Sequence, residues 1–216
     1  STSGEEGIEI ETSSIGYSLS KDTRDNYMNA KLGEVFNSNI TLAGFGGDAK
    51  FVSLQTKYKK YIPFEYGDYV LSFAGKAGII SSIDDEKITS SNRKYFSSKQ
   101  IRGFDSNGVG PRDEGNLVGV GGNKYYTGSI EMRTKKFSPE DLGIEVGLFT
   151  DFGSLWDTDY PTNVIGEDDS GPRMTTGASV YWDTAVGPLN FTWAWPITDE
   201  SYDVENNFKF SIGTSF

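Results

Sequence analysis

The chain has 216 residues, 31 acidic and 20 basic side chains and a net charge of −11, which is enough length for one large β domain or two small ones. Cysteine and histidine are both absent, which excludes disulfide bonds, thiolate chemistry and the commonest general base and metal ligand. The acidic balance argues against a nucleic-acid-binding surface. The first residues, STSGEEGIEIE, have neither a basic region nor an apolar core, so we expect no signal peptide, and no apolar run reaches the length of a transmembrane helix.

Apolar residues alternate with Ser, Thr, Asn, Gly, Lys or Glu along most of the chain, which is the pattern of β-strands. In chain order, the alternating segments cover residues 15–19, 36–42, 52–62, 71–79, 126–132, 144–152, 174–182, 189–197 and 208–216. A long polar break at 81–122 separates the fourth segment from the fifth. The sequence therefore predicts an all-β fold of about eight or nine strands with one long loop.

Alternation by itself fits two architectures, because a soluble sandwich packs its apolar faces together and a membrane barrel turns them to lipid. Most of the predicted strands have about 9–14 residues, and a tilted bilayer crossing needs roughly 9–11. Short connections at 137–143 and 185–186 alternate with long polar ones at 81–122, 155–172 and 198–206, as periplasmic turns and outer loops do. Aromatic residues also gather near strand ends, as in an interfacial girdle. We therefore predict a transmembrane antiparallel β-barrel, with the sandwich as the alternative.

Four motifs in order carry a family resemblance. They are IRGF at 101–104, GLFTDFGSLWD at 147–157, GPLNFTWAWPI at 187–197 and the closing FKFSIGTSF at 208–216. Together they resemble the BamA family of outer-membrane protein assembly factors, and the match runs from near residue 13 to the end. The resemblance implies a sixteen-stranded barrel that follows periplasmic POTRA domains and folds other barrels into the outer membrane of a Gram-negative-type bacterium.

The number of predicted strands matches only the C-terminal half of such a barrel. We expect an N-terminal extension at 1–12 and a transmembrane β-barrel domain at 13–216, with a long extracellular loop at about 81–122. Three explanations stay open: a trimmed piece of a longer chain, a split protein whose other half is a second chain, or a small barrel closed by these strands alone. A barrel of about eight strands has a lumen just filled by side chains, so the long loop would not fit easily inside it.

The resemblance also assigns a loop motif, formed by Ile101, Arg102, Gly103 and Phe104, that tucks back into the barrel lumen. It implies that Arg102 contacts Glu131 and Asp151 on the inner wall. Strand alternation agrees, since both carboxylates fall on the face opposite the apolar residues of neighbouring strands, and a guanidinium can bind carboxylates in a bidentate way. The alternative is that Arg102 is a solvated loop residue without a partner.

The closing strand has the pattern of a C-terminal β-signal, with Phe208, Phe210, Ile212 and Phe216 on its lipid-facing side. The strand must find a partner to close a barrel, because an unpaired edge in lipid leaves backbone groups unsatisfied. In the family a glycine at the position of Gly213 lets this strand kink, so that the seam with the first strand is weak and opens sideways. The plainer alternative is that Gly213 only relieves crowding beside an aromatic ring.

We expect no covalent catalysis, no cofactor and no metal. Acidic clusters at 84–86, 113–114 and 167–169 lack the spacing of an EF-hand, and we interpret them as solvated loop acids. The predicted function is assembly of outer-membrane β-barrels through a weak lateral seam. A polypeptide-transporting pore of the two-partner secretion type and a truncated structural barrel are the alternatives. The predicted partners are the lipid bilayer and unfolded outer-membrane clients, with accessory lipoproteins or a separate N-terminal barrel half in addition, and no nucleic acid.

Overall fold

A single large antiparallel sheet dominates the computed structural model, which describes residues 11–27, 29–84, 87–139, 142–160, 163–184 and 187–212. Its strands are β1 (Ser14–Asp22), β2 (Gly33–Ala43), β3 (Phe51–Phe64), β4 (Tyr69–Ser82), β7 (Lys124–Thr134), β8 (Ile144–Trp156), β10 (Arg173–Thr184), β11 (Gly187–Thr198) and β13 (Phe208–Ile212). Each pairs with its neighbours in this order. The prediction of an all-β antiparallel fold with eight or nine strands is confirmed.

Shorter elements lie in the connections. They are the 3-10 turn η1 (Glu65–Gly67) and the strands β5 (Gly103–Phe104), β6 (Arg112–Asp113), β9 (Val164–Ile165) and β12 (Glu205–Asn206). β5 pairs with β12, and β6 with β9, so that the long connection between β4 and β7 is tied to two later loops. No helix in the described part of the chain is long and apolar enough to cross a membrane.

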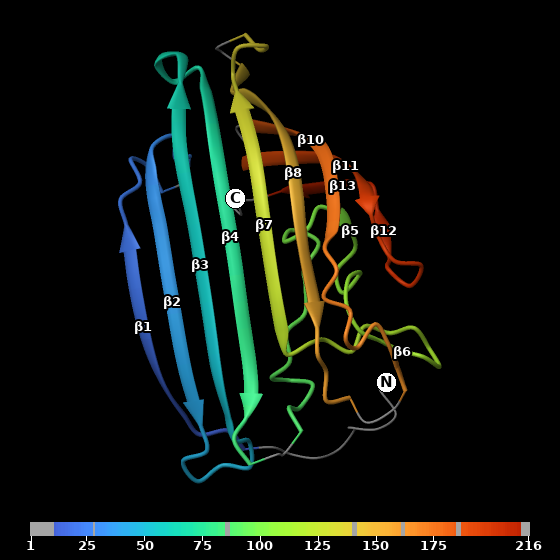
Figure 1. Ribbon diagram of the computed structural model, residues 1–216. Coiled ribbons are helices and arrows are strands. Elements are labelled where there is room, and N and C mark those ends of the chain that lie inside the picture. The colour runs from blue at the N-terminus through green and yellow to red at the C-terminus, as the bar shows by residue number, and fades with distance from the viewer. Residues whose placement is uncertain are drawn as a thin grey trace.

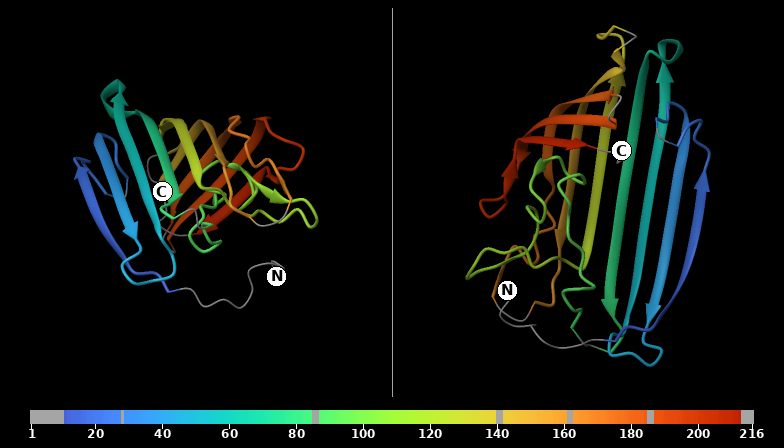
Figure 2. Two further views of the ribbon diagram at one scale, coloured as in Figure 1. Left: turned by 60° about the horizontal axis from the view of Figure 1, so that its bottom comes forward. Right: turned by 180° about the vertical axis from the view of Figure 1, so that it is seen from behind.

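The sheet is curved into an open trough (Figure 1). Figure 2 shows the strands along an arc, with the connection between β4 and β7 on its concave side. β1 and β13 form the two edges of the sheet, and no ladder joins them within the residues that the structure describes. The described strands therefore do not form a small closed barrel, which was one of the three explanations that the sequence allowed. The long connection occupies the space inside the arc.

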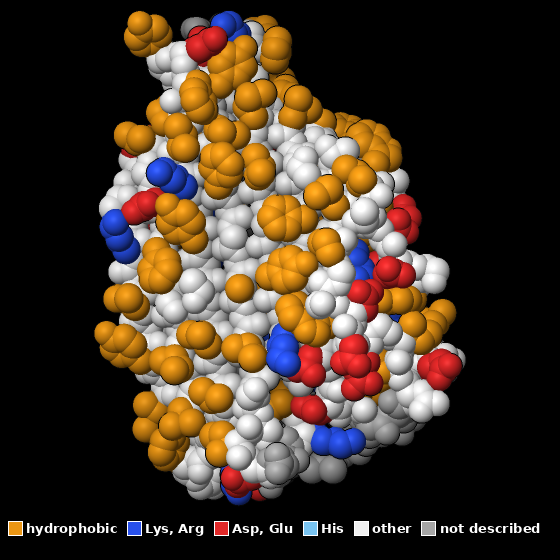
Figure 3. Space-filling model, in the orientation of Figure 1, with side chains coloured by type: hydrophobic (Ala, Val, Ile, Leu, Met, Phe, Trp, Pro, Cys, Tyr) orange, Lys and Arg blue, Asp and Glu red, His pale blue; other side chains and the backbone are white. Residues whose placement is uncertain are grey.

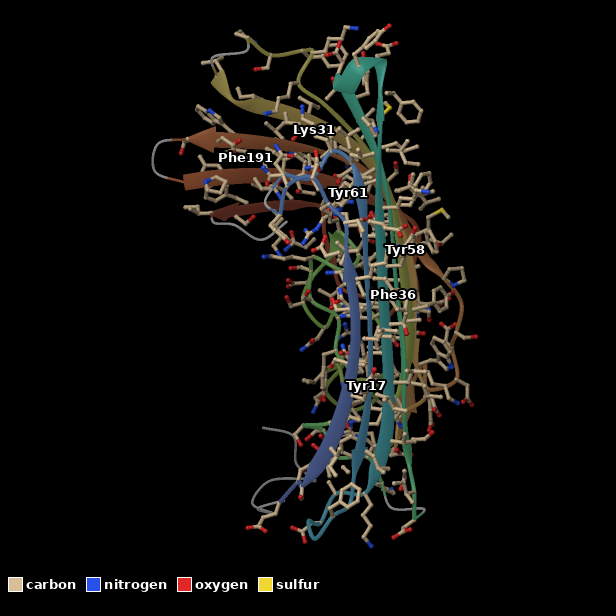
Figure 4. All side chains as sticks on the ribbon, turned by 90° about the vertical axis from the view of Figure 1, so that its left-hand side faces the viewer. Tyr17, Lys31, Phe36, Tyr58, Tyr61 and Phe191 are labelled. Carbon is tan, nitrogen blue, oxygen red and sulfur yellow. The ribbon has the colours of Figure 1, made fainter. Side chains whose placement is uncertain are left out.

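The convex face of the sheet is apolar and exposed (Figure 3). Large side chains in cross-strand register continue from strand to strand, as in the row Ile40, Leu54 and Ile79 on β2, β3 and β4. Figure 4 shows the sheet from its side, with Phe36 and Tyr58 directly opposite each other on the convex face. Apolar residues so exposed over many strands are typical of a lipid-facing surface.

Strand β11 illustrates how the alternation divides the two faces. Trp193 and Trp195 point outward and are 38% and 53% exposed, whereas Thr192 and Ala194, which alternate with them, are 6% and 1% exposed. Successive side chains of a strand point to opposite faces, so the sequence pattern alone assigns them. The alternation predicted for residues 189–197 is therefore confirmed.

The buried core lies on the concave face, beneath the connections. The largest cluster joins the long connection to β7 and β8 and consists of Phe96, Ile101, Phe104, Val109, Tyr125 and Leu155. At the opposite end, the turn between β1 and β2 folds inward, so that Ala30 packs with Tyr61 and Val70 on the inner face. These apolar contacts hold both segments against the inner wall of the trough.

Candidate functional site

The segment Ile101–Phe104 lies against the inner wall of the trough. Ile101 and Phe104 are 1% and 2% exposed, and both belong to the apolar cluster on β7 and β8. Gly103 has a φ of +99°, and a Cβ atom there would lie 3.1 Å from Thr175 and 3.2 Å from Ala194. Only glycine combines that backbone conformation with so close an approach to β10 and β11.

Between these anchors, Arg102 extends its guanidinium to two carboxylates. Its Nε and Nη2 atoms donate to the two oxygens of Asp151 at 2.7 and 2.8 Å, which is a bidentate pair. Nη1 donates to Oε1 of Glu131 at 2.8 Å. The backbone N–H of Arg102 also donates to Asp151, at 3.1 Å. The structure thus brings together the three residues that the sequence had singled out.

Neighbouring inner-wall residues complete this cluster. Ser129 donates to Oδ1 of Asp151 at 2.7 Å, and the hydroxyl of Tyr181 donates to Oε1 of Glu131 at 2.7 Å. The guanidinium carbon of Arg102 lies 3.4 Å from the centroid of the Phe149 ring, as in a stacked cation–π contact. Strand alternation puts Ser129 and Phe149 on the inner face, but it indicates no role for either residue. Nothing in the local sequence around Tyr181 indicated a contact with Glu131.

The electrostatics of the cluster keep the guanidinium of Arg102 permanently charged. Burial alone lowers the pKa of Arg102, but the hydrogen bonds and charge of Asp151, with the charge of Glu131, outweigh it and raise that pKa above its usual value. Arginine therefore keeps its proton at every physiological pH. The arrangement holds a loop against a wall and does not transfer protons.

A second ionic cluster joins the connection between β8 and β10 to the connection between β11 and β13. Arg173, at the start of β10, donates from Nε to Asp203 at 2.8 Å, from Nη1 to Asp169 at 2.8 Å and from Nη2 to the hydroxyl of Tyr202 at 2.8 Å. Tyr202 in turn donates to Asp169 at 2.7 Å. Burial, with the hydrogen bond to Asp169, raises the pKa of Tyr202 to about 12. The interpretation of Asp169 as a solvated loop acid is therefore wrong: it pairs with Arg173, four residues further along the chain, and with Tyr202, which is distant in the sequence and which no local pattern indicates.

Strand β13 is the part of the predicted seam that lies within the described residues. Phe208, Phe210 and Ile212 are exposed on the convex face, and the first two pack against aromatic rings of β11 at centroid distances of 5.3 and 5.0 Å. Gly213 and Phe216 lie outside the described residues. One side of β13 pairs with β11 from Phe208 to Ile212, and its other side has no strand partner in the described ranges.

Comparisons with known proteins agree with this geometry. The Omp85 superfamily domain matches residues 2–216. The outer membrane protein assembly factor BamA of Neorickettsia risticii is 29% identical over 204 residues, which is 94% of this chain and 27% of that protein. The SAM50-like protein of Schizosaccharomyces pombe is 25% identical over 212 residues, which is 94% of this chain and 44% of that protein.

A solved structure shares the fold. The crystal structure of BamA from Haemophilus ducreyi lacking POTRA domains 1–3 superposes with a TM-score of 0.83 at 21% sequence identity, covering 94% of this chain and 42% of that one. The chain thus spans about a quarter to less than half the length of these relatives. The predicted resemblance to the BamA family is confirmed, and the chain matches one part of its barrel. The chain belongs to the Omp85 superfamily.

Proposed function

We propose that this chain is the C-terminal barrel part of a factor that assembles β-barrel proteins in a bacterial outer membrane. The observation that carries the proposal is the loop segment Ile101–Phe104, held on the inner face of a nine-stranded trough by Arg102 between Glu131 and Asp151. The printed names of the BamA and SAM50-like relatives, which are assembly factors, support it. Residues 13–216 form the barrel domain in this proposal, and residues 1–12 an extension.

The edge of β13 is where a client strand joins the sheet. An exposed strand edge presents N–H and C=O groups that an incoming strand can pair with, which is β-augmentation. In lipid, that pairing is strongly favoured because the bilayer core offers no other hydrogen-bonding partner. The client is an unfolded outer-membrane protein, and no covalent step or cofactor takes part.

The other edge, β1, needs a partner for the same reason. All its residues are exposed, and its outward side chains include Ile15, Tyr17 and Leu19. Strands of an N-terminal barrel half, in the same polypeptide or in a separate one, pair with β1 in this proposal. The partners are the bilayer, the client and that half, with accessory lipoproteins as further candidates.

Reconstitution into liposomes tests the function. The full-length protein is inserted into vesicles and supplied with an unfolded outer-membrane protein, and folding of the client is followed by its resistance to protease. We expect the client to fold faster than in empty vesicles. Ion conductance without client folding would instead support a transport pore. The absence of both client folding and ion conductance would support a structural barrel.

A further inference from the structure

A cavity of about 280 Å³ opens on the inner side of the trough, between the loop segment and the last strands. Lys59 of β3, Lys99 of the loop and Lys209 of β13 all line it. The strands that carry these residues are far apart in the sheet, and the curl of the trough brings them to one cavity. The cavity lies directly beside the edge strand β13.

Positive charge dominates the cavity wall. Among its described lining residues, the basic ones are Lys59, Lys99, Arg102, Arg133 and Lys209, and the acidic one is Glu131. Glu131 is already paired with Arg102, and Arg133 lies 3.7 Å from Glu145 on β8. Lys59 and Lys209 have no carboxylate partner within the described ranges. This surplus is notable in a chain whose net charge is −11.

Two of the lysines at the cavity, Lys99 and Lys209, lie close to each other. The ammonium of Lys209 donates to the hydroxyl of Ser98, the residue before Lys99. Lys99 is near enough for its charge to act unfavourably on that of Lys209, and Asp105 is near enough for its charge to act favourably on it. Gathering like charges in a partly buried site is unfavourable until an anion enters, so the arrangement favours an oxyanion such as a carboxylate or a phosphate.

The position of Lys209 on β13 indicates where the anion comes from. Lys209 points inward, opposite Thr192 on β11, and its other side faces the free edge. A strand added there would place an inward side chain about 4.5–5.5 Å from Lys209, measured between Cβ atoms, and an opposite-charge pair at that spacing is favourable. A lipid phosphate is a poorer candidate, since the apolar face that suits lipid is the convex one (Figure 3), whereas inward-facing residues such as Thr192 and Lys209 line the cavity.

We propose that this cavity binds the carboxylate of an inward-facing Asp or Glu on the client strand that pairs with β13. The inference rests on the proposed assembly function and adds a preference among client sequences to it. The lysines thereby help to set the register of the incoming strand, because shifting it by one residue turns the acidic side chain to the lipid face.

A strand peptide with one inward-facing Glu tests the proposal. Its binding to the full-length protein in nanodiscs is measured by fluorescence anisotropy, beside an otherwise identical peptide with Gln at that position. We expect Lys209→Gln or Lys59→Gln to weaken binding of the Glu peptide about fivefold and to leave the Gln peptide unchanged, as for the loss of one charged contact. Lys60→Gln is the matched control, since Lys60 is exposed on the opposite face of β3 and should change neither.

Inorganic phosphate separates the sources of the anion. If phosphate displaces the Glu peptide and not the Gln peptide, the shared oxyanion site is supported. Equal binding of the two peptides by the parent protein overturns the proposal, whether or not phosphate binds. If the parent folds clients in vesicles but shows no preference for Glu, the inference fails and the proposed function stands. If the parent folds no client at all, the function itself fails.

Discussion

Replacing Arg102 with alanine should release the loop from the inner wall. The change removes four side-chain hydrogen bonds of the guanidinium, two to Asp151, one to Glu131 and one to Ser129. It also leaves Asp151, whose side chain is 2% exposed, without a counter-ion. Breaking a buried pair in this way typically costs about 3–5 kcal/mol. At the lower end, about 3 kcal/mol raises the population with an undocked loop roughly 150-fold.

Limited proteolysis of the reconstituted protein measures this population, because cleavage beside the buried residues Ile101 and Phe104 requires the loop to leave the trough. Lys87→Ala is the matched control, since Lys87 is exposed in the same connection and should leave the cleavage rate unchanged. Adding Asp151→Asn to Arg102→Ala removes the stranded charge and should restore part of the protection. Cleavage of Arg102→Ala at the parental rate would refute the idea that the ion pair holds the loop.

Three further results are expected. Phe191→Arg places a charge on the lipid face and should cost about 2–4 kcal/mol in folding titrations, whereas Asn190→Arg on the inner face should cost much less; equal losses would argue against a lipid-facing convex surface. Gly103→Ala forces a side chain into a left-handed conformation against β10 and β11 and should cost about 1–3 kcal/mol, seen as a lower thermal midpoint; an unchanged midpoint would contradict the close approach. In the outer loops, burial raises the pKa of Asp169, but hydrogen bonds from Tyr202 and Gly171 outweigh it, so that this pKa lies below its ordinary value. The stabilisation from Asp169 is therefore complete at neutral pH and is lost as the pH falls below about 4, and Asp169→Asn should make loop protection against an acid-active protease less sensitive to pH in that range.

Strand identity and orientation could be predicted because they depend on local alternation. Ile130 and Glu131 are adjacent in sequence and must point to opposite faces in any strand, so the inward carboxylate follows from the pattern. The position of Arg102 was harder to predict, because no periodicity indicates where a residue in a polar loop will lie. The family motif supplied that information, and the cluster around Arg102 then required only that two neighbouring strands present acids on the same face.

Contacts between distant loops could not be predicted in this way. Arg173 begins β10 and Asp203 lies in the connection after β11, so their pairing depends on how the end of β11 lies against the start of β10. The cavity near Lys59 and Lys209 depends on the curl of the whole sheet, which is a property of many strands and not of any segment. The alternation of each strand can be predicted from a single sequence. The curvature of the sheet that nine such strands form together cannot.

The most direct test of the central claim is disulfide cross-linking to a client during assembly. The chain has no cysteine, so one engineered thiol reports one position. Ile212→Cys on β13 and Ile130→Cys in the middle of the sheet are matched, since both residues are isoleucines exposed on the convex face. The account predicts that a client stalled in folding, with single cysteines along its first strand, cross-links to residue 212 at alternate positions and not to residue 130. Equal cross-linking at both sites, or insertion of the client without any cross-link to β13, would contradict assembly at this edge.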